Sequence, residues 1–434
     1  MGLSVWCNRS NRTEVLSLPL FKSPARWLKS HRCFPWPPAL GVFLVAVVLL
    51  LGSWLHPSPA SQPSWVKGVW LTHIDSDVLF ASQSTHSALK DLKNLGFNTV
   101  YPTVWNDGYT LYPSAVAKKY LGEAHLPHAG LAQRDFLAEL IDQAHSHQLR
   151  VVPWFELGLM TPQAVPWAQD HPDWFTVTHT GDALWWEGQQ KPRLWLNPLH
   201  PKVQQLITAL LVDLVERYDL DGIQLDDHFG YPAHMGYDHL TRRQFQQAQG
   251  GQEAPPPPDL DLERNCVVAD ATWQAWVDWR AEKITEFVTD LVHTLKARKP
   301  GLIISISPNP QTFSKNCSLL DWQSWQERGL IDELVLQVYR RNLEAFQKEL
   351  QQPEVQRAKQ RVPVVVGILA GLKNRPVSLA DLQSQAEWVQ NNDFAGFSFF
   401  FYESLWNYGL ESPQQRRRTL GQILQKYPPH APKN

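Results

Sequence analysis

The chain has 434 residues, of which 43% are hydrophobic and 19% are charged. This balance is typical of folded proteins and excludes a disordered or fibrous chain. The formal net charge is −2, and no stripe of basic residues could follow a phosphate backbone, which argues against nucleic acid as a partner. The 20 tryptophans exceed what a core of this size needs. Because an indole ring is a flat surface on which sugar rings stack, they favour a carbohydrate ligand.

The N-terminal part differs in composition from the rest of the chain. Residues 1–38 are polar and basic, with Glu14 as the single acidic residue, and an apolar run at residues 39–55 and a linker at residues 56–64 follow. This order predicts an export signal or a membrane anchor. The run is shorter than the roughly 20 residues of a spanning helix, and Ser58-Pro59-Ala60 offers a cleavage site, so both interpretations stay open. Because the basic side stays in the cytoplasm, we expect export across the cytoplasmic membrane, with attachment to the membrane only if the segment is uncleaved.

Beyond residue 64, short apolar runs alternate with helical patterns, which predicts a parallel sheet with connecting helices. The predicted strands are Gly68–Ile74, Thr99–Val104, Arg150–Phe155, Gly222–Leu225, Leu302–Ser307, Glu333–Val338, Pro363–Ile368 and Gly396–Phe401. The predicted helices include Thr85–Asn94, Arg134–His145, Pro201–Tyr218, Ala271–Ala297 and Leu379–Asn391. Eight such units fit a (β/α)8 barrel at residues 65–425 with loop insertions and a tail at residues 426–434. Such a barrel carries function at the C-terminal ends of its strands. A doubly wound open sheet is the alternative, but its usual Gly-rich turn after the first strand is missing.

The longest predicted insertion follows the fourth strand. Gly250-Gly251 and the run Pro255–Pro258 interrupt it, so we expect an exposed loop over the barrel mouth. Cys266 and Cys317 are the cysteines beyond the apolar run, and we predict that they form a disulfide in an oxidising compartment. Neither a C-x-x-C nor a His-x-x-x-His spacing occurs, so no metal site or cofactor is predicted.

The fourth strand delivers a group of ionisable side chains into a turn. The apolar run Gly222–Leu225 is followed directly by Asp226, Asp227 and His228. Because adjacent residues on a strand point to opposite faces, we expect one aspartate to react and the other to orient or support it. A helix N-cap or a calcium-like surface turn, which Asp-Asp runs often form, is the alternative interpretation.

Polar and aromatic residues follow almost every predicted strand. Glycoside hydrolysis needs a carboxylic acid to protonate the leaving oxygen and a carboxylate that acts as nucleophile or base, with aromatic platforms that position the ring. The chain lacks a Gly-x-Ser-x-Gly elbow, so acyl transfer is disfavoured. The predicted substrate-binding residues are Asp75, Trp105, Asn106, Trp154, His228, Asn309, Gln337, Tyr339, Glu403 and Trp406.

Short motifs in a fixed order carry a family resemblance. They are Gly68-Val69-Trp70-Leu71-Thr72, Val152-Pro153-Trp154-Phe155-Glu156, Asp221-Gly222-Ile223-Gln224-Leu225-Asp226-Asp227, Asp278-Trp279-Arg280, Asp321-Trp322, Gly329-Leu330-Ile331-Asp332-Glu333 and Gln337-Val338-Tyr339-Arg340. With them, residues 65–425 resemble the bacterial family 10-like glycosyl hydrolases. The resemblance implies a (β/α)8 barrel, a periplasmic or cell-envelope location and action on glycans, and peptidoglycan strands stripped of peptide are a substrate associated with relatives.

A second resemblance concerns the reacting group. The pattern Asp221-Gly222-x-x-x-Asp226 is similar to strand four of the α-amylase clan, which implies that Asp226 rather than Asp227 reacts. That clan also has an acid on strand five, but here this strand ends in Ser305–Asn309, so the acid must come from elsewhere.

Two glutamates are candidates for the acid, Glu156 after the third strand and Glu403 after the eighth. We favour Glu156, because apolar neighbours would raise its pKa and keep it protonated; a salt-bridged rim glutamate is the alternative. We therefore predict a glycoside hydrolase for a cell-envelope or extracellular polysaccharide, with Asp226 as nucleophile or base, Glu156 as acid and Asp227 as electrostatic partner.

Two rival functions stay open. A catalytically silent glycan-binding barrel would present much the same aromatic and acidic side chains. A metal-dependent hydrolase or deacetylase would use Asp226, Asp227 and His228 with another histidine. The sequence makes no prediction of oligomeric state.

Overall fold

The structure is a computed structural model and describes residues 65–187, 191–258, 266 and 270–426. The predicted N-terminal segments at residues 1–38, 39–55 and 56–64 lie outside the described residues, as does all but the first residue of the predicted tail. Within the described residues, no helix combines the length and the apolar character that a membrane span requires.

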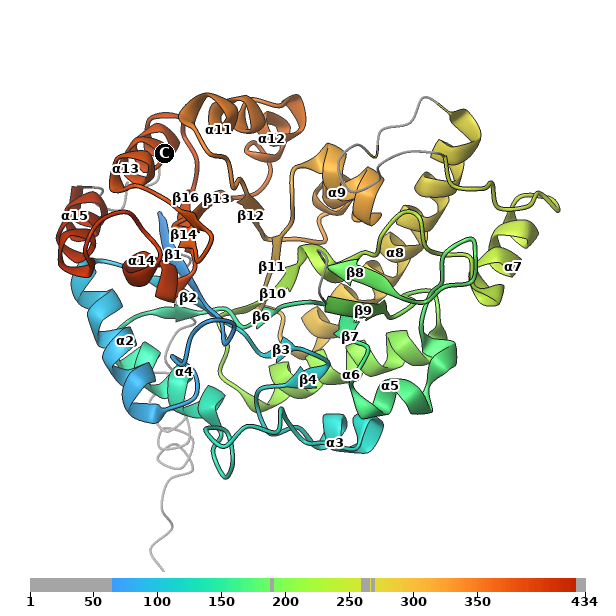
Figure 1. The fold of residues 1–434 in the computed structure, drawn as a ribbon, viewed down its shortest axis with the longest axis horizontal. Coiled ribbons are helices and arrows are strands. Elements are labelled where there is room, and N and C mark those ends of the chain that lie inside the picture. The colour runs from blue at the N-terminus through green and yellow to red at the C-terminus, as the bar shows by residue number, and fades with distance from the viewer. Residues whose placement is uncertain (1–64, 188–190, 259–265, 267–269, 427–434) are drawn as a thin grey trace, which may run out of the picture. The chain divides into compact units, whose positions relative to one another are not determined.

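The described chain forms a closed barrel of parallel strands surrounded by helices (Figure 1). The strands are β1 (Val66–Leu71), β2 (Thr99–Pro102), β5 (Arg150–Val151), β6 (Trp154–Phe155), β10 (Gly222–Asp226), β11 (Ile303–Ser307), β12 (Glu333–Gln337), β13 (Val364–Leu369) and β16 (Gly396–Phe400). They pair in the order β5-β2-β1-β16-β13-β12-β11-β10-β6. Because β5 and β6 are consecutive pieces of one segment, and they pair with β2 and β10 respectively, the ring closes. The predicted (β/α)8 barrel is confirmed.

The third barrel strand is broken where its sequence contains a proline. Pro153 has no N–H and cannot donate to the ladder, yet its carbonyl accepts from the Gln224 amide at 2.8 Å. The Val152 amide donates to the Val100 carbonyl at 3.0 Å, on the other side. The segment therefore links β2 to β10 although it does not form the continuous strand that we predicted.

The other predicted strands are present with small shifts at their ends. The largest shift is in the first strand, which we predicted to reach Ile74 but which ends at Leu71. The chain turns there because the Thr72 hydroxyl accepts a hydrogen bond from the Ile74 amide at 3.1 Å. This turn directs Thr72 toward the barrel axis, where it becomes part of the candidate site.

The five predicted helices are present as α2 (Ser82–Leu95), α4 (Phe136–Ser146), α6 (Pro201–Arg217), α8 (Ala271–Arg298) and α13 (Leu379–Asn391). The further helices are α3 (Ala115–Leu121), α5 (Pro166–Asp170), α7 (His239–Ala248), α9 (Gln311–Ser318), α10 (Trp322–Glu327), α11 (Leu343–Leu350), α12 (Pro353–Ala358), α14 (Tyr402–Asn407) and α15 (Pro413–Lys426), with the 3-10 turns η1 (Pro172–Trp174) and η2 (Asp227–Phe229).

Within the described residues, the loops of the barrel contain three small antiparallel sheets. They are β3–β4 (Trp105–Asn106 and Tyr109–Thr110), β7–β9–β8 (Met160–Pro162, Lys191–Trp195 and Trp185–Glu187) and β14–β15 (Gly371–Leu372 and Arg375–Pro376). The β7–β9–β8 sheet forms an insertion after the third barrel strand that the sequence did not lead us to expect. It packs beside the C-terminal end of β10, as described below.

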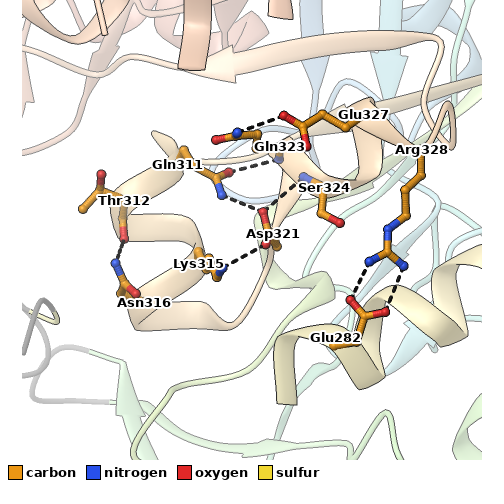
Figure 2. A pocket seen from close by; sticks show the side chains of 10 residues that line it. All are labelled: Glu282, Gln311, Thr312, Lys315, Asn316, Asp321, Gln323, Ser324, Glu327 and Arg328. Atoms are coloured by element: carbon orange, nitrogen blue, oxygen red, sulfur yellow. Dashed lines mark hydrogen bonds and ion pairs between the residues drawn. The ribbon is translucent and has the colours of Figure 1, made fainter. Parts of the chain in front are cut away.

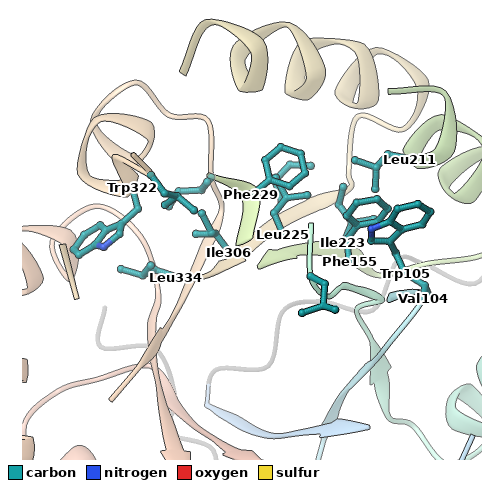
Figure 3. Close-up of a cluster of buried hydrophobic side chains, with 14 of the residues drawn as sticks. Val104, Trp105, Phe155, Leu211, Ile223, Leu225, Phe229, Ile306, Trp322 and Leu334 are labelled. Atoms are coloured by element: carbon teal, nitrogen blue, oxygen red, sulfur yellow. The ribbon is translucent and has the colours of Figure 1, made fainter. Parts of the chain in front are cut away.

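Successive side chains of β10 point to opposite sides of the sheet, one toward the helices and the next toward the barrel interior. Ile223 and Leu225 belong to the apolar layer between strands and helices, together with Phe155 and Leu211 (Figure 3). Gln224 and Asp226 have the opposite parity and face the barrel interior. Burial of the apolar residues thus fixes the direction of the Asp226 carboxyl.

A buried polar layer crosses the lower barrel interior. Glu333 forms an ion pair with Arg150 and accepts from the Tyr101 hydroxyl at 3.1 Å and the Ser305 hydroxyl at 2.9 Å. Gln224 donates to Ser305 at 3.0 Å. Aromatic rings lie above this layer, with the centroids of Trp70 and Trp154 6.2 Å apart.

Candidate active site

Asp226 ends β10 with its carboxyl group at the barrel mouth, and it is only 1% exposed. Its Oδ1 accepts from Trp154 Nε1 at 3.1 Å, from Ser307 Oγ at 3.2 Å and from Gln337 Nε2 at 3.4 Å. Its Oδ2 lies 2.6 Å from His228 Nδ1. The donors come from the neighbouring strands β6 and β11, from β12 one strand further away, and from the following turn, so several elements of the fold hold this carboxyl in place.

Asp227 and His228 form the first turn after the strand, η2. His228 Nδ1 lies between the two carboxyl groups, 3.1 Å from Asp227 Oδ1. Asn309 Nδ2 donates to Asp227 Oδ2 at 2.6 Å, and Gln337 Nε2 reaches Asp227 Oδ1 at 3.4 Å. The two aspartates, the histidine, Asn309 and Gln337, all of them predicted site residues, therefore make one hydrogen-bonded cluster.

The charges in this cluster differ from one residue to the next. Burial and the negative charge of Asp227 raise the pKa of Asp226 to about 7, against the opposing pull of His228. For Asp227, burial by itself raises the pKa, but the His228 charge and the hydrogen bonds with His228, Asp226 and Gln337 together lower it. Burial by itself lowers the pKa of His228, but the charges and hydrogen bonds of Asp227 and Asp226 raise this pKa well above its usual value. Near neutral pH, His228 is protonated, Asp227 is ionised and Asp226 is close to its midpoint.

Glu156 follows β6 and is also buried, 7% exposed. Its Oε2 accepts from Thr103 Oγ1 at 2.7 Å and from Thr72 Oγ1 at 3.2 Å. Burial raises the pKa of Glu156, and His73, Thr103, Asn106 and Thr72 oppose this only in part. No lysine or arginine pairs with it within the described residues, so the salt-bridged rim glutamate is not what the structure contains.

The charges of both groups of carboxyls act on the Tyr339 phenol. Tyr339 follows β12, and its ring stacks on Phe400 with centroids 5.3 Å apart. Burial raises the pKa of the Tyr339 phenol, and the charges of Asp226, Asp227 and Glu156 raise it further. The charges of all three acidic side chains therefore act on this one phenol.

Several predicted sugar-binding residues have other roles. Trp105 is fully buried, stacks on Phe155 and donates to the Gly158 carbonyl at 3.0 Å. Trp406 is 5% exposed and packs against Arg417. The prediction of a stacking platform is wrong for both, because these rings fill the layer between strands and helices.

Trp154 and Asn106 are also buried and are not sugar platforms. Trp154, 3% exposed, supports Asp226 through its indole N–H. The Asn106 side chain is fully buried near Glu156, and its amide atoms have no hydrogen bond of normal geometry. Sequence position alone placed both residues at strand ends but could not show how deep they lie.

Asp75 and Glu403 lie on the rim, away from the carboxyl cluster. Asp75 forms an ion pair with Lys373. Glu403 accepts from Ser76 Oγ at 3.2 Å and from Asn407 Nδ2 at 2.7 Å, and it lines a surface pocket beside α2. The alternative acid is therefore engaged elsewhere, which leaves Glu156 as the better candidate.

Thr72, Thr103 and Trp195 belong to the site but were not predicted as site residues. The two threonines end strands with inward parity, and that alternation could have identified them. Trp195 comes from the unpredicted β9 and stacks on His228, with ring centroids 5.8 Å apart and planes at 23°. No local signal in the sequence connects Trp195 to His228.

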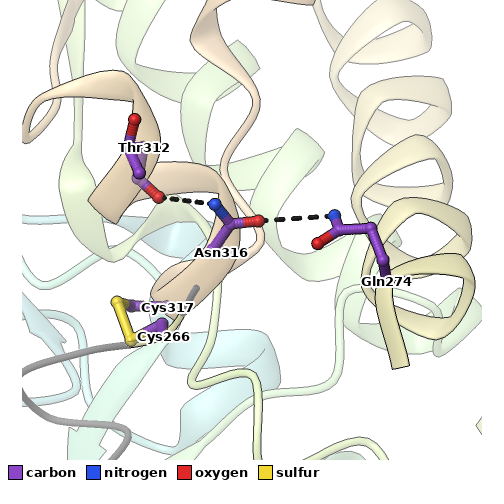
Figure 4. Close-up of a disulfide and its surroundings, with 5 residues drawn as sticks. All are labelled: Cys266, Gln274, Thr312, Asn316 and Cys317. Atoms are coloured by element: carbon purple, nitrogen blue, oxygen red, sulfur yellow. Dashed lines mark hydrogen bonds between the residues drawn. A yellow bond between two sulfur atoms is a disulfide. The ribbon is translucent and has the colours of Figure 1, made fainter. Parts of the chain in front are cut away.

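Helix α9 packs against η2, the turn that carries Asp227 and His228. Asn309, just before the helix, donates to Asp227, and the Cys317 carbonyl near its end accepts from the Ala233 amide at 2.8 Å. The predicted disulfide is present at that end and joins Cys317 to Cys266, with Cα atoms 5.1 Å apart (Figure 4). The disulfide thus ties the insertion after β10 to the helix that backs the site.

Metal binding is possible at one place among the described residues. Asp226, Asp227 and His228 offer ligand atoms that all lie within 4.8 Å of one another. No second histidine belongs to this group. His228 Nδ1 lies within hydrogen-bond distance of both carboxylates. A proton on Nδ1 that is shared between them accounts for these short distances without a metal ion.

A polar pocket of about 480 Å³ lies between α8, α9 and α10 (Figure 2). Its charged groups pair with each other. Arg328 pairs with Glu282 at 2.6 Å, and Lys315 pairs with Asp321 at 3.2 Å. Because these charged groups pair with each other, the pocket offers a ligand few unpaired charges. The strand ends are therefore the better candidate site.

The chain is similar in sequence to two proteins named as glycosyl hydrolases. Glycosyl hydrolase DigH of Escherichia coli (strain K12) is 26% identical over 326 residues, which cover 66% of this chain and 65% of that protein. Glycosyl hydrolase YngK of Bacillus subtilis (strain 168) is 23% identical over 330 residues, covering 69% and 58% respectively. The chain thus spans less than two thirds of the length of either relative.

Among solved structures, the glycoside hydrolase domain of PgaB (BpsB) from Bordetella bronchiseptica has a TM-score of 0.57 at 15% identity, covering 80% of this chain and all of that one. The catalytic domain of β-amylase from Paenibacillus polymyxa has a TM-score of 0.55 at 13% identity, covering 83% and 98%. At these identities the likeness shows the fold alone. The model of the family described as Glycosyl hydrolase-like 10 matches residues 65–390, well over half of the sequence, and the chain belongs to that family.

Proposed function

We propose that this protein is an active glycoside hydrolase. The supporting observation is that Glu156 and the Asp226–Asp227 pair lie at the ends of two paired strands, β6 and β10, with protonation preferences that differ among them. Two carboxyl groups in different protonation states are what acid and base catalysis at one glycosidic bond requires.

In the proposed reaction, Glu156 protonates the glycosidic oxygen as its bond to the anomeric carbon breaks. The Asp226 carboxylate either attacks that carbon or removes a proton from the water that does so. The ionised Asp227 and protonated His228 hold the Asp226 carboxylate in place and balance its charge. The Asp226 pKa of about 7 means that a large share of the molecules has this carboxylate ionised at neutral pH.

We further propose a cell-envelope polysaccharide as substrate, with peptide-free glycan strands of peptidoglycan as the first candidate. The Cys266–Cys317 disulfide supports an exported location, because such bonds persist in oxidising compartments. The basic N-terminal segment and the apolar run after it fit export across the cytoplasmic membrane, with the segment either cleaved or kept as an anchor.

The test is incubation of the purified full chain with these strands and with other polysaccharides, while new reducing ends are measured. Asp226→Asn should reduce turnover by about 10³-fold or more and retain glycan binding. Asp221→Asn, at the opposite end of β10, is the matched control and should retain turnover. Binding without new reducing ends from any polysaccharide would instead support a silent glycan-binding barrel.

One observation favours a second function, a metal-dependent hydrolase or deacetylase. It is the set of close ligand atoms on Asp226, Asp227 and His228. Activity that survives exhaustive treatment with a chelator would exclude this function, whereas loss of activity and its recovery on addition of a divalent cation would favour it.

A further inference from the structure

A group of arginines lies on the rim of the barrel beside Tyr339. Arg340 and Arg341 lie in the segment after β12, just beyond Tyr339, and Arg375 belongs to the β14–β15 hairpin after β13. Arg375 Nη2 donates to the Tyr339 carbonyl at 3.1 Å, which fixes the hairpin to the segment after β12. These guanidinium groups therefore sit at the C-terminal ends of two neighbouring strands, on the same edge as the carboxyl cluster.

Two of these charges have no ionic partner. Arg340 pairs with Glu349 at 3.0 Å. Arg341 is exposed and Arg375 is half-buried, and within the described ranges no carboxylate forms an ion pair with either one. We refer to Arg341 and Arg375 as the arginine pair.

The arrangement is unfavourable for folding. Burial lowers the pKa of the Arg375 guanidinium, and the like charges of Arg341 and Arg340 lower it further. Arg340 and Arg341 also precede the N-terminus of α11, where the helix dipole is positive and disfavours cations. Arg375 gains the hydrogen bond to the Tyr339 carbonyl, but within the described residues the Arg341 guanidinium has no hydrogen bond or ion pair that would offset the cost. Residues that cost stability in this way are expected at functional sites.

The arginine pair does not neutralise the catalytic carboxyls. The charges that act on the Tyr339 phenol are those of Asp226, Asp227 and Glu156, not those of the arginines. None of the arginines is among the main causes of the pKa shifts of Asp226 or Glu156. Arg375 thus contacts the backbone of Tyr339, whereas the acidic side chains act on its phenol.

We propose that Arg341 and Arg375 form a subsite for an anionic group, a carboxylate in the first instance, on a sugar next to the one that reacts. A planar guanidinium matches a carboxylate through two parallel hydrogen bonds, and an anion there would relieve the repulsion between like charges. This proposal rests on the proposed glycosidase function and adds the substrate class, an acidic glycan.

Binding is the direct test. The ligands are peptide-free peptidoglycan glycan strands and the same strands after their carboxyl groups have been reduced to alcohols. The full chain carrying Asp226→Asn is used, so that ligand survives the measurement. Arg341→Gln and Arg375→Gln should each weaken binding of the acidic strands about tenfold, leave binding of the reduced strands unchanged, and lessen the salt dependence of the affinity. Arg361→Gln, before β13 at the opposite end of the barrel, is the matched control and should change neither.

The outcomes separate this proposal from the one on which it rests. Equal binding of acidic and reduced strands, or equal losses for both in the arginine variants, would refute the anionic subsite even if the wild type cleaves glycans. Selective, arginine-dependent binding of acidic strands, with no cleavage of these strands or any other polysaccharide by the wild type, would support the subsite and refute the glycosidase. Failure of the chain to bind either form of strand would refute the subsite, and the glycosidase as well if no polysaccharide is cleaved.

Discussion

Replacement of His228 by glutamine tests whether the histidine sets the ionisation of Asp226. The distances from Nδ1 to the two carboxylates are 2.6 and 3.1 Å. A pair of opposite charges about 4 Å apart interacts by about 4 kcal/mol at an effective dielectric constant near 20, equivalent to about 3 pKa units. Because His228 is 27% exposed, part of this is screened, and we expect the Asp226 pKa to rise by about 1 to 3 units from its value near 7.

The assay is the pH dependence of kcat/KM on a cleaved glycan, and its direction of change is informative. If Asp226 acts as a carboxylate, a higher pKa means that it ionises only in more alkaline solution, so the acidic limb of the profile moves upward. If Asp226 instead acts as the proton donor, the alkaline limb moves upward. The experiment therefore assigns the role of Asp226 as well as its electrostatic partner.

The control uses a similar pair at the other end of the same strand. His145 Nε2 lies 3.0 Å from Asp221 Oδ2, and this contact raises the pKa of His145. His145→Gln should lower the thermal stability and leave both limbs in place. If the limbs also stay in place in a folded His228→Gln protein, Asp226 is not the titrating group and the reasoning above is wrong.

Three further predictions concern the interior and the site. Arg150→Met leaves the Glu333 carboxylate buried without its partner and should lower the free energy of unfolding in urea by about 3–5 kcal/mol; adding Glu333→Leu should recover most of this, and no recovery would contradict the mechanism. Cys317→Ser opens a covalent loop between cysteines 51 residues apart and should cost about 2–4 kcal/mol, a difference from wild type that must vanish in reductant. Thr103→Val removes a 2.7 Å donor to Glu156, so the Glu156 pKa should rise and the alkaline limb of kcat/KM should move upward; Thr103→Ser keeps the donor and should not move it.

The barrel was predictable because its strands are strongly apolar and its helices are strongly periodic. Helix α13 has the predicted bounds, Leu379–Asn391, and β10 extends one residue beyond the prediction. The single break, in the third strand, comes from Pro153, whose effect on the ladder was legible in the sequence but was overlooked. Predictions of strands and helices from residues close together in the sequence were therefore reliable.

The candidate site was predictable in part. Asp226, Asp227, His228, Asn309 and Gln337 lie together because each ends or follows a strand, and topology brings strand ends to one edge. The burial of the aromatic side chains was not predictable, because a tryptophan that follows a strand can face either the barrel mouth or the surrounding helices.

The parts of the site that come from insertions were not predictable from strand order. Trp195 reaches His228, and Arg193 reaches Asp107 at 3.0 Å, from β9, a strand that pairs only within its own small sheet. Strand order says where the ends of barrel strands meet. It says nothing about where an insertion folds back, because that depends on packing between surfaces far apart in the sequence.

The register between strands accounts for the contacts of Asp226. In the parallel ladder Asp226 is opposite Ser307, and Gln224 is opposite both Ser305 and Trp154. The hydroxyl of Ser307 and the indole N–H of Trp154 are therefore brought to the Asp226 carboxyl by the same pairing that buries Leu225 against the helices. A shift of one residue would reverse every side chain of β10 and place Asp226 in the apolar layer, at the cost of a buried unpaired carboxyl group. The packing outside the barrel and the acid–base chemistry inside it are thus enforced by one register, and neither can change without loss of the other.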